Sequence, residues 1–246
     1  MRKILILVGE YCLLMRKVFV KPDKPRLFWK QFLTELDKLG MSSIPLVAII
    51  SVFIGAVIAL QTANNMTSPL LPKMYIGFMT RETMLLEFSS TMIALILAGK
   101  IGSNISSEIG TMRITEQIDA LEMMGVNSAN YLILPKVAAA TLFNPLLMLM
   151  SFVVGLFGGW IIVTATEIIT SSQYIDGLQF AFNSFYIVYS MIKMAVFSFI
   201  ITSVASFYGY NAKGGSLQVG QASTSAIVSC CICILIFNLI LTHLLL

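Results

Sequence analysis

Residues 44–63 read IPLVAIISVFIGAVIALQTA and contain no charged side chain. A transmembrane α-helix needs about 20 predominantly apolar residues to cross the hydrocarbon core of a bilayer. This stretch is therefore long enough and apolar enough to span a membrane. The rest of the chain agrees, since 57% of its 246 residues are hydrophobic and 11% are charged, against about 25% charged residues in a typical soluble domain.

Four more stretches predict membrane-spanning helices. The longest of them, residues 137–166, carries no charge and exceeds the length that a span needs, so we expect it to tilt, or to kink at Pro145. Residues 64–83 are expected to be a loop because they hold two prolines and several charged or polar residues, and residues 167–183 form another polar connection. The four predicted spans are residues 84–105, 137–166, 185–208 and 222–246.

Residues 1–43 precede the first span and carry nine of the chain's sixteen Lys and Arg residues. Apolar side chains recur at helical spacing from Ile4 to Phe19, which predicts a helix lying in the membrane surface. Glu10 interrupts this run and no small-residue cleavage site follows it, so the segment does not fit a signal peptide. A second amphipathic stretch follows, with Trp29 as an interfacial anchor.

The predicted fold is an all-α integral membrane protein in two parts. An interfacial amphipathic region (residues 1–43) precedes a five-span domain (residues 44–246), and five spans place the termini on opposite sides of the membrane. With a cytoplasmic N-terminus, thirteen Lys and Arg residues lie in the cytoplasm, and only Lys73 and Arg81 lie outside. The positive-inside rule therefore predicts that the N-terminus is cytoplasmic and the C-terminus external.

The second and third spans are joined through SEIGTMRITEQIDALEMMG, residues 107–125. Apolar and acidic side chains fall on different faces of a helix predicted over residues 111–124, and Gly125 suits its C-terminal stop. Two interpretations remain open: a solvated loop helix, or a cytoplasmic helix that presents its acidic strip to a soluble partner. The apolar face holds Ile114, Ile118 and Leu121, and the acidic strip holds Glu116, Asp119 and Glu122.

Several motifs resemble the MlaE family, permease subunits of ABC transporters that move lipids between bacterial membranes. Residues 107–125 are the longest and most specific of these motifs. At the start of the second span, LEFSS (residues 86–90) keeps, as Glu87, the Glu of the family's Arg-Glu-Leu-Gly-Pro. The other motifs are IALQ (residues 58–61), AGKIGS (residues 98–103), YLILPK (residues 131–136) and GGSLQVGQASTSAIV (residues 214–228).

This resemblance implies a lipid-transport permease in the bacterial inner membrane, with residues 107–125 as the coupling helix that docks on a cytoplasmic ATPase. It also implies an MCE-domain protein on the periplasmic side and, in some systems, a STAS-domain protein on the ATPase side. Because five helices are few to enclose a lipid path, we expect a two-fold homodimer. The residues expected to couple to the ATPase are Glu108, Thr111, Arg113, Glu116, Gln117, Asp119 and Leu121.

Glu87 and Lys193 are charged residues inside predicted spans, where a charge is costly unless it faces the protein interior or a wet cavity. Each lies early in a span that runs inward, so their depths should match. Two interpretations remain open: a buried pair that fixes helix packing, and a polar patch that touches lipid headgroups. Lys100 and Lys136 lie near the cytoplasmic boundary and are expected to snorkel.

The sequence predicts no catalytic residue, metal site, cofactor or nucleic-acid partner. Residues 98–103 contain Gly-Lys but lack the upstream glycine and the adjacent Ser or Thr of a Walker A loop, so ATP hydrolysis is expected on a partner chain. Two other functions remain as alternatives to lipid transport. One is a passive channel or ion-coupled carrier that uses Glu87 and Lys193, and the other is a membrane anchor for a cytoplasmic complex.

Overall fold

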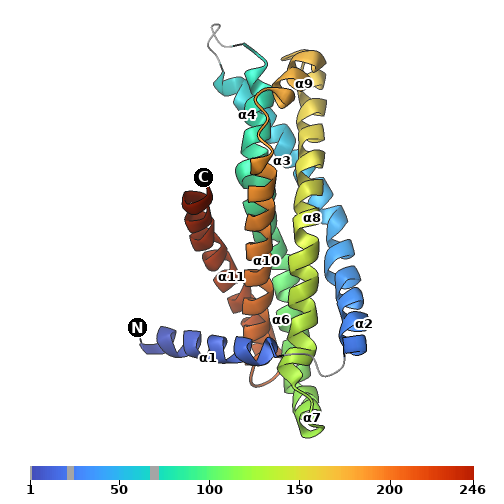
Figure 1. Cartoon of the computed structure of the whole chain (residues 1–246), viewed down its shortest axis with the longest axis vertical. Helices are drawn as coiled ribbons and strands as arrows, with labels where there is room; N and C mark the ends of the chain where they lie inside the picture. Colours follow the sequence, from blue (N-terminus) through green and yellow to red (C-terminus); the bar gives the residue numbers. More distant parts are fainter. Residues whose placement is uncertain (1, 21–24, 67–71) are drawn as a thin grey trace.

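The computed structural model describes residues 2–20, 25–66 and 72–246, and every regular element in these ranges is helical. Among the described residues, five helices are long and apolar enough to cross a membrane. Four of them run side by side, and the last leans away from the others (Figure 1). The all-α fold with five spans is thus confirmed. Spans one to five are Pro25–Asn65, Tyr75–Ile114, Ser128–Ala165, Phe185–Tyr210 and Ser216–Leu245.

Helix α1 (Arg2–Val18) lies crosswise to the bundle (Figure 1). One of its faces is buried against the spans through Met15 and Val18. The hydroxyl of Tyr11 donates a hydrogen bond to Oγ of Ser203 in span four, at 2.9 Å. These contacts fix α1 across one end of the bundle.

The amphipathic stretch expected to follow α1 is the first part of span one. Span one consists of four helical segments that succeed one another without a break. The predicted boundary after residue 43 therefore falls inside one continuous helix. The segments are α2 (Pro25–Glu35), the π-helical turn η1 (Leu36–Gly40), the short 3-10 turn η2 (Met41–Ser43) and α3 (Ile44–Asn65).

Span two begins earlier than predicted. Residues 64–83 are expected to be a loop, but α4 (Tyr75–Thr83) already belongs to the span's helix. The charges of Arg81 and Glu82 suggest exposure in the sequence, yet the side chain of Arg81 is buried. It pairs with Glu82 at 2.5 Å and donates to the carbonyl oxygen of Leu178 at 2.7 Å. This pairing lets a charged helical turn pack inside the protein.

The rest of span two alternates between α-helical and π-helical segments. These are η3 (Met84–Met92), α5 (Ile93–Leu97), η4 (Ala98–Gly102) and α6 (Ser103–Ile114). Segments η3 and η4 are π-helical, a conformation that is rare and is often found at functional sites. Glu87 lies in η3.

Glycines bring α3 and the long helix α8 (Ser128–Ala165) into backbone contact. A Cβ atom on Gly55 would collide with the carbonyl group of Gly155, and one on Gly158 would collide with that of Val52. Small residues at such an interface allow two membrane helices to approach closely. Spans one and three are therefore in close backbone contact.

Helix α8 continues unbroken through Pro135 and Pro145. The polar connection at residues 167–183 contains a short helix, α9 (Ser171–Gln179), and α10 (Phe185–Tyr210) forms span four. Helix α9 packs on α4 and α8, and α10 packs on α8 and α6 (Figure 1).

Helix α11 (Ser216–Leu245) is the least covered span. Only 17% of its most apolar stretch is buried inside the protein, and the helix diverges from α10 along its length (Figure 1). Leu235, Leu239 and Leu244 are among its exposed apolar residues. An apolar surface of this extent needs lipid or another protein chain to cover it.

Candidate functional site

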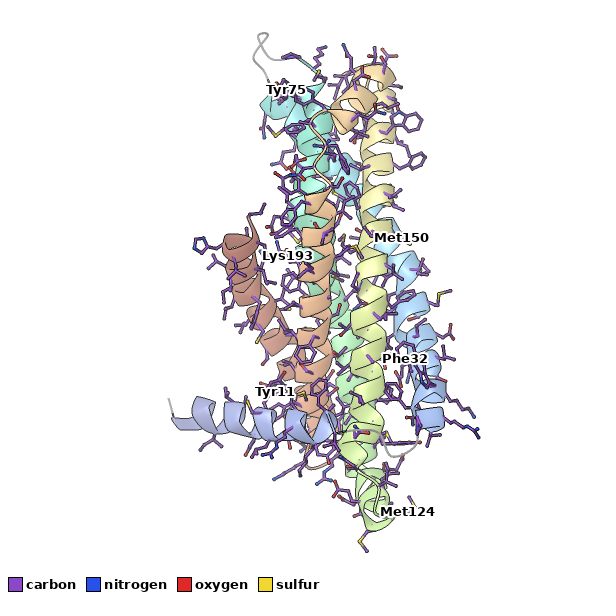
Figure 2. The ribbon with its side chains drawn as sticks, viewed as in Figure 1. Tyr11, Phe32, Tyr75, Met124, Met150 and Lys193 are labelled. Carbon is purple, nitrogen blue, oxygen red and sulfur yellow. The ribbon has the colours of Figure 1, made fainter. Side chains whose placement is uncertain are left out.

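The connection between spans two and three projects beyond the bundle (Figure 1). It contains the short helix α7 (Gln117–Met123), and we call residues 115–127 the α7 turn. The end of the bundle that carries it is the α7 end, and the opposite end is the α9 end. Met124 marks the tip of the projection (Figure 2).

The α7 turn is not the single helix predicted over residues 111–124. Helix α6 ends at Ile114, and Glu116 adopts a left-handed conformation with φ of +60°, which is uncommon for a residue with a side chain. The predicted stop at Gly125 is confirmed, with φ of +75°. The N–H groups of Gly125 and Val126 donate to the carbonyl oxygens of Glu122 and Leu121, at 2.9 and 3.1 Å, as in a Schellman motif.

The acidic residues of the turn do not form one free strip. The left-handed residue Glu116 lies before α7 and is exposed. Asp119 pairs with Arg113 of α6 at 2.6 Å. The carboxylate of Glu122 accepts hydrogen bonds from the hydroxyls of Ser128 and Tyr210, both at 2.8 Å, and these bonds hold its pKa below the usual value. Two of the three acids therefore brace the turn against the bundle.

The apolar face of the turn points largely into the protein. Ile118 is fully buried in the main core, and Leu121 is partly buried against it. Met123 and Met124 face outward, with exposed fractions of 90% and 69%. These methionines were not among the predicted contact residues, although an apolar pair directly before a helix-terminating glycine is a usable signal.

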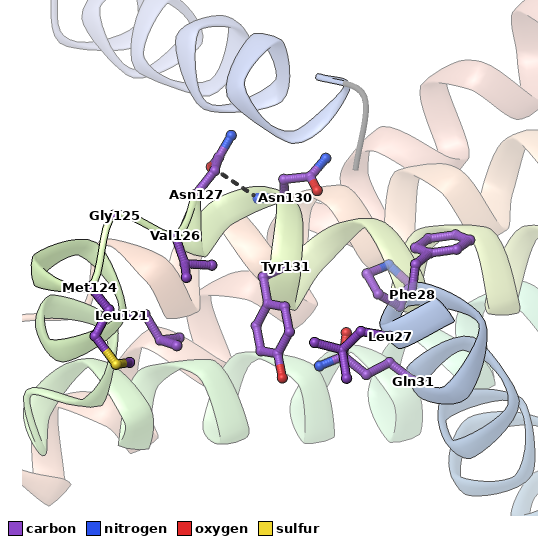
Figure 3. A pocket seen from close by; sticks show the side chains of 11 residues that line it. Leu27, Phe28, Gln31, Leu121, Met124, Gly125, Val126, Asn127, Asn130 and Tyr131 are labelled. Atoms are coloured by element: carbon purple, nitrogen blue, oxygen red, sulfur yellow. Dashed lines mark hydrogen bonds between the residues drawn. The ribbon is translucent and has the colours of Figure 1, made fainter. Parts of the chain in front are cut away.

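A groove of about 350 Å³ lies beside the α7 turn (Figure 3). Leu27 and Gln31 of α2 face Tyr131 of α8 across it, and Leu121 belongs to its α7 side (Figure 3). Most of the lining is apolar. Asn127 caps α8 here by accepting a hydrogen bond from the backbone N–H of Asn130 at 3.2 Å, which satisfies one of the unpaired N–H groups at the start of the helix.

Four charged side chains meet at the α7 end. Lys136 of α8 donates to Glu35 of α2 at 2.6 Å and to Oε2 of Glu108 at 2.9 Å. Lys38 of η1 reaches the same oxygen of Glu108 at 2.8 Å. We call these residues the four-charge cluster. The side chain of Lys136 is only 3% exposed, so the expectation that it snorkels is wrong, because two carboxylates from neighbouring helices compensate its charge inside the protein.

A second buried lysine lies about midway along the bundle (Figure 2). Lys193 of α10 is fully buried and pairs with Glu87 at 2.9 Å. Its ammonium group also donates to the hydroxyls of Tyr189 and Thr242 at 3.0 and 3.2 Å. Asn238 of α11 donates to the other oxygen of Glu87 at 3.2 Å. We call these five residues the mid-span cluster.

Of the two interpretations that the sequence left open, the structure shows the paired one, and contact with lipid headgroups stays a prediction. Glu87 and Lys193 contact each other, and with Thr242 they link spans two, four and five. The pair is nevertheless open on one side, since the side chain of Glu87 is 40% exposed whereas that of Lys193 is not exposed. A molecule that reaches this cluster would meet a carboxylate first.

Most of the helices described above lie in a region that matches a known protein family. The family model for "Permease MlaE" matches residues 32–244. This chain belongs to the MlaE permease family. A relative from Rickettsia bellii, named a probable ABC transporter permease protein, is 32% identical over 96% of this chain and 91% of its own length.

Other MlaE relatives carry more specific names. The Haemophilus influenzae protein named intermembrane phospholipid transport system permease protein MlaE is 28% identical over 85% of this chain and 80% of its own length. The chloroplastic protein TRIGALACTOSYLDIACYLGLYCEROL 1 of Arabidopsis thaliana is 30% identical over 92% and 64%. The α7 turn, the four-charge cluster and the mid-span cluster lie within the residues that match the MlaE family model, whereas α1 lies before them.

Proposed function

We propose that this chain is the membrane-spanning subunit of an ABC transporter that moves phospholipid or a related lipid, driven by a separate ATPase. The observation that carries the proposal is the α7 turn, a projecting element held at its base by polar bonds to three helices. Asp119 pairs with Arg113, and Glu122 bonds to Ser128 and Tyr210. A braced projection of this kind can pass a force from a soluble motor to the spans on either side of it.

The seven residues expected to couple to the ATPase then divide into two roles. Three of them, Thr111, Glu116 and Gln117, are exposed. Together with the exposed Met123 and Met124, they form the surface that contacts the ATPase. The remaining four act inside the permease, by bracing the α7 turn or by joining it to neighbouring spans. These four are Glu108, Arg113, Asp119 and Leu121.

The proposed orientation places the α7 end in the cytoplasm of a bacterial inner membrane, with the N-terminus inside and the C-terminus in the periplasm. The excess of Lys and Arg at this end supports it, and α1 would then lie in the inner membrane surface. In a cysteine-free background, Met123→Cys should resist an impermeant thiol reagent added outside, and Ser171→Cys should react with it. The reverse labelling pattern would contradict this orientation.

Further partners follow from the same proposal. A second copy of the chain would pack near α11, whose exposed apolar surface supports a homodimer with the lipid path between the copies. An MCE-domain protein would meet the α9 end, and a STAS-domain protein would bind on the ATPase side. In this assembly, Glu87 and Lys193 are the candidate polar groups of the lipid path.

The test is reconstitution of the permease with its ATPase, with co-purification, ATP hydrolysis and lipid transfer measured on one preparation. Glu116→Lys reverses a charge on the proposed contact surface and should release the ATPase, or leave it hydrolysing ATP without lipid transfer. Glu167→Lys is a matched control, because Glu167 is also exposed, also left-handed with φ of +51°, and lies at the α9 end. Normal coupling in Glu116→Lys, Asp119→Lys would mean that the turn is only a solvated loop.

A further inference from the structure

The four-charge cluster lies where the two arms of the α7 turn meet span one. Glu108 is on α6, the arm that enters the turn, and Lys136 is on α8, the arm that leaves it. Glu35 and Lys38 come from α2 and η1 of span one. Each residue in this set has an oppositely charged partner, so three spans are joined at one level by ionic bonds.

We propose that this cluster is the joint through which movement of the α7 turn reaches span one, with Lys136 as its central positioning residue. The inference rests on the proposed docking of an ATPase at the α7 turn. Contacts within the turn link it to spans two, three and four, through Arg113, Ser128 and Tyr210. Lys136 adds a directional link from the arms of the turn to α2, and through α2 to the continuous helix of span one.

The chemistry of the cluster suits a joint better than simple packing. Apolar contacts alone could hold these helices together, and a buried ion pair often adds no net stability over well-packed apolar residues. Charge-assisted hydrogen bonds, however, have fixed directions and lengths, so they resist sliding of one helix along another. Lys136 makes two such bonds from a position that is 3% exposed, where water cannot easily replace either partner.

The cluster also contains its own internal control. Lys38 and Lys136 donate to the same oxygen of Glu108, at 2.8 and 2.9 Å, but the side chain of Lys38 is 42% exposed. An exposed pair contributes little, because solvent screens it. Lys136→Met and Lys38→Met therefore remove the same charge from the same carboxylate, and only the first cuts the buried link to Glu35.

The experiment measures lipid transferred per ATP hydrolysed in the reconstituted complex of permease and ATPase. Lys136→Met should lower this ratio by about tenfold while the ATPase stays bound, since residues on a coupling path change coupling by factors of that order. Lys38→Met should lower it by about twofold or less. Lys136→Arg keeps the charge and the reach, and should restore most of the ratio.

A neutral variant keeps the test valid if Lys136→Met fails to fold. Glu35→Gln with Lys136→Met leaves Lys38 paired with Glu108 and no uncompensated charge, and should assemble with the ATPase yet show the same low ratio. An unchanged ratio in this variant would contradict the proposal that the cluster transmits movement to span one. Failure of both variants to assemble would also contradict it, because the cluster would then be needed only for folding. A wild-type complex without ATP-dependent lipid transfer would instead refute the proposed function itself.

Discussion

The two buried lysines of this protein are held in different ways. Lys136, at the α7 end, is compensated by two carboxylates, Glu35 and Glu108, which come from different helices. Lys193, midway along the bundle, has one carboxylate, Glu87, and completes its bonding with neutral oxygens. One cluster is therefore built from opposite charges, and the other from a single ion pair inside a set of hydroxyl, amide and carbonyl groups.

This difference separates two tasks that a driven transporter must perform. An ionic cluster made of charged groups alone has few alternative arrangements, which suits the transmission of a movement. Hydroxyls can rotate and exchange partners at little cost, and the mid-span cluster is open at Glu87, whose side chain is 40% exposed. That arrangement suits contact with a polar group that arrives and leaves.

The largest effect on stability is expected at the mid-span cluster. Glu87→Leu leaves Lys193 fully buried without its carboxylate, and should lower the free energy of unfolding by about 3–5 kcal/mol. Lys193→Met should cost less, about 1–3 kcal/mol, because the partly exposed Glu87 can be solvated. Denaturant unfolding in mixed micelles measures both. Equal losses in the two variants would mean that Glu87 is as enclosed as Lys193.

An intermediate loss is expected at the four-charge cluster. Lys136→Met leaves Glu35 and Glu108 without their shared partner, at a cost of about 2–3 kcal/mol, reduced because Lys38 remains and Glu108 is partly exposed. Adding Glu35→Gln should recover part of this loss, since Glu35 is the more buried carboxylate. The same unfolding measurement applies. A further loss on adding Glu35→Gln would show that the carboxylate does not depend on Lys136.

Sequence patterns predicted the spans and the matched depth of Glu87 and Lys193, but they did not predict the four-charge cluster. Composition alone identifies five apolar helices, and matched depth in neighbouring spans correctly brought Glu87 and Lys193 to one level. The partners of Lys136 could not be foreseen, because Glu35 and Glu108 lie on other helices whose rotations are set by packing. Arg81 misled the prediction for the same reason, since its charge is compensated by backbone carbonyls and Glu82 inside the protein.

The break in the α7 turn was equally invisible in the sequence. A left-handed residue is usually Gly, and Glu116 gives no such signal. The acidic spacing therefore predicted a continuous strip, whereas the turn moves Glu116 off the helix and directs Glu122 to Ser128 and Tyr210. Gly125 was predicted correctly, because its conformational freedom is visible in the residue type.

The smallest effect is expected from the brace at Glu122. Its folded pKa lies below the usual value for a Glu, so its stabilisation is complete above that usual value and is lost as pH falls through the folded pKa. The carboxylate is largely exposed, so the loss should be about 1 kcal/mol or less. A spin label on Met123→Cys should gain mobility only at acidic pH, below the usual pKa of a Glu side chain, about 4.3. A change between about pH 6 and 8 would assign the titration to another group.

Photo-crosslinking at residue 238 tests the proposed lipid path most directly, because Asn238 belongs to the mid-span cluster and a photoreactive residue in its place keeps the Glu87–Lys193 pair. The matched control is Val153 of α8, which is 63% exposed and follows Met150, the residue drawn near the height of Lys193 (Figure 2). In the ATPase-bound complex, lipid adducts at position 238 should change between nucleotide-free and hydrolysing states, while those at position 153 stay constant. Adducts that are indifferent to ATP at both positions would contradict a driven lipid path past this cluster.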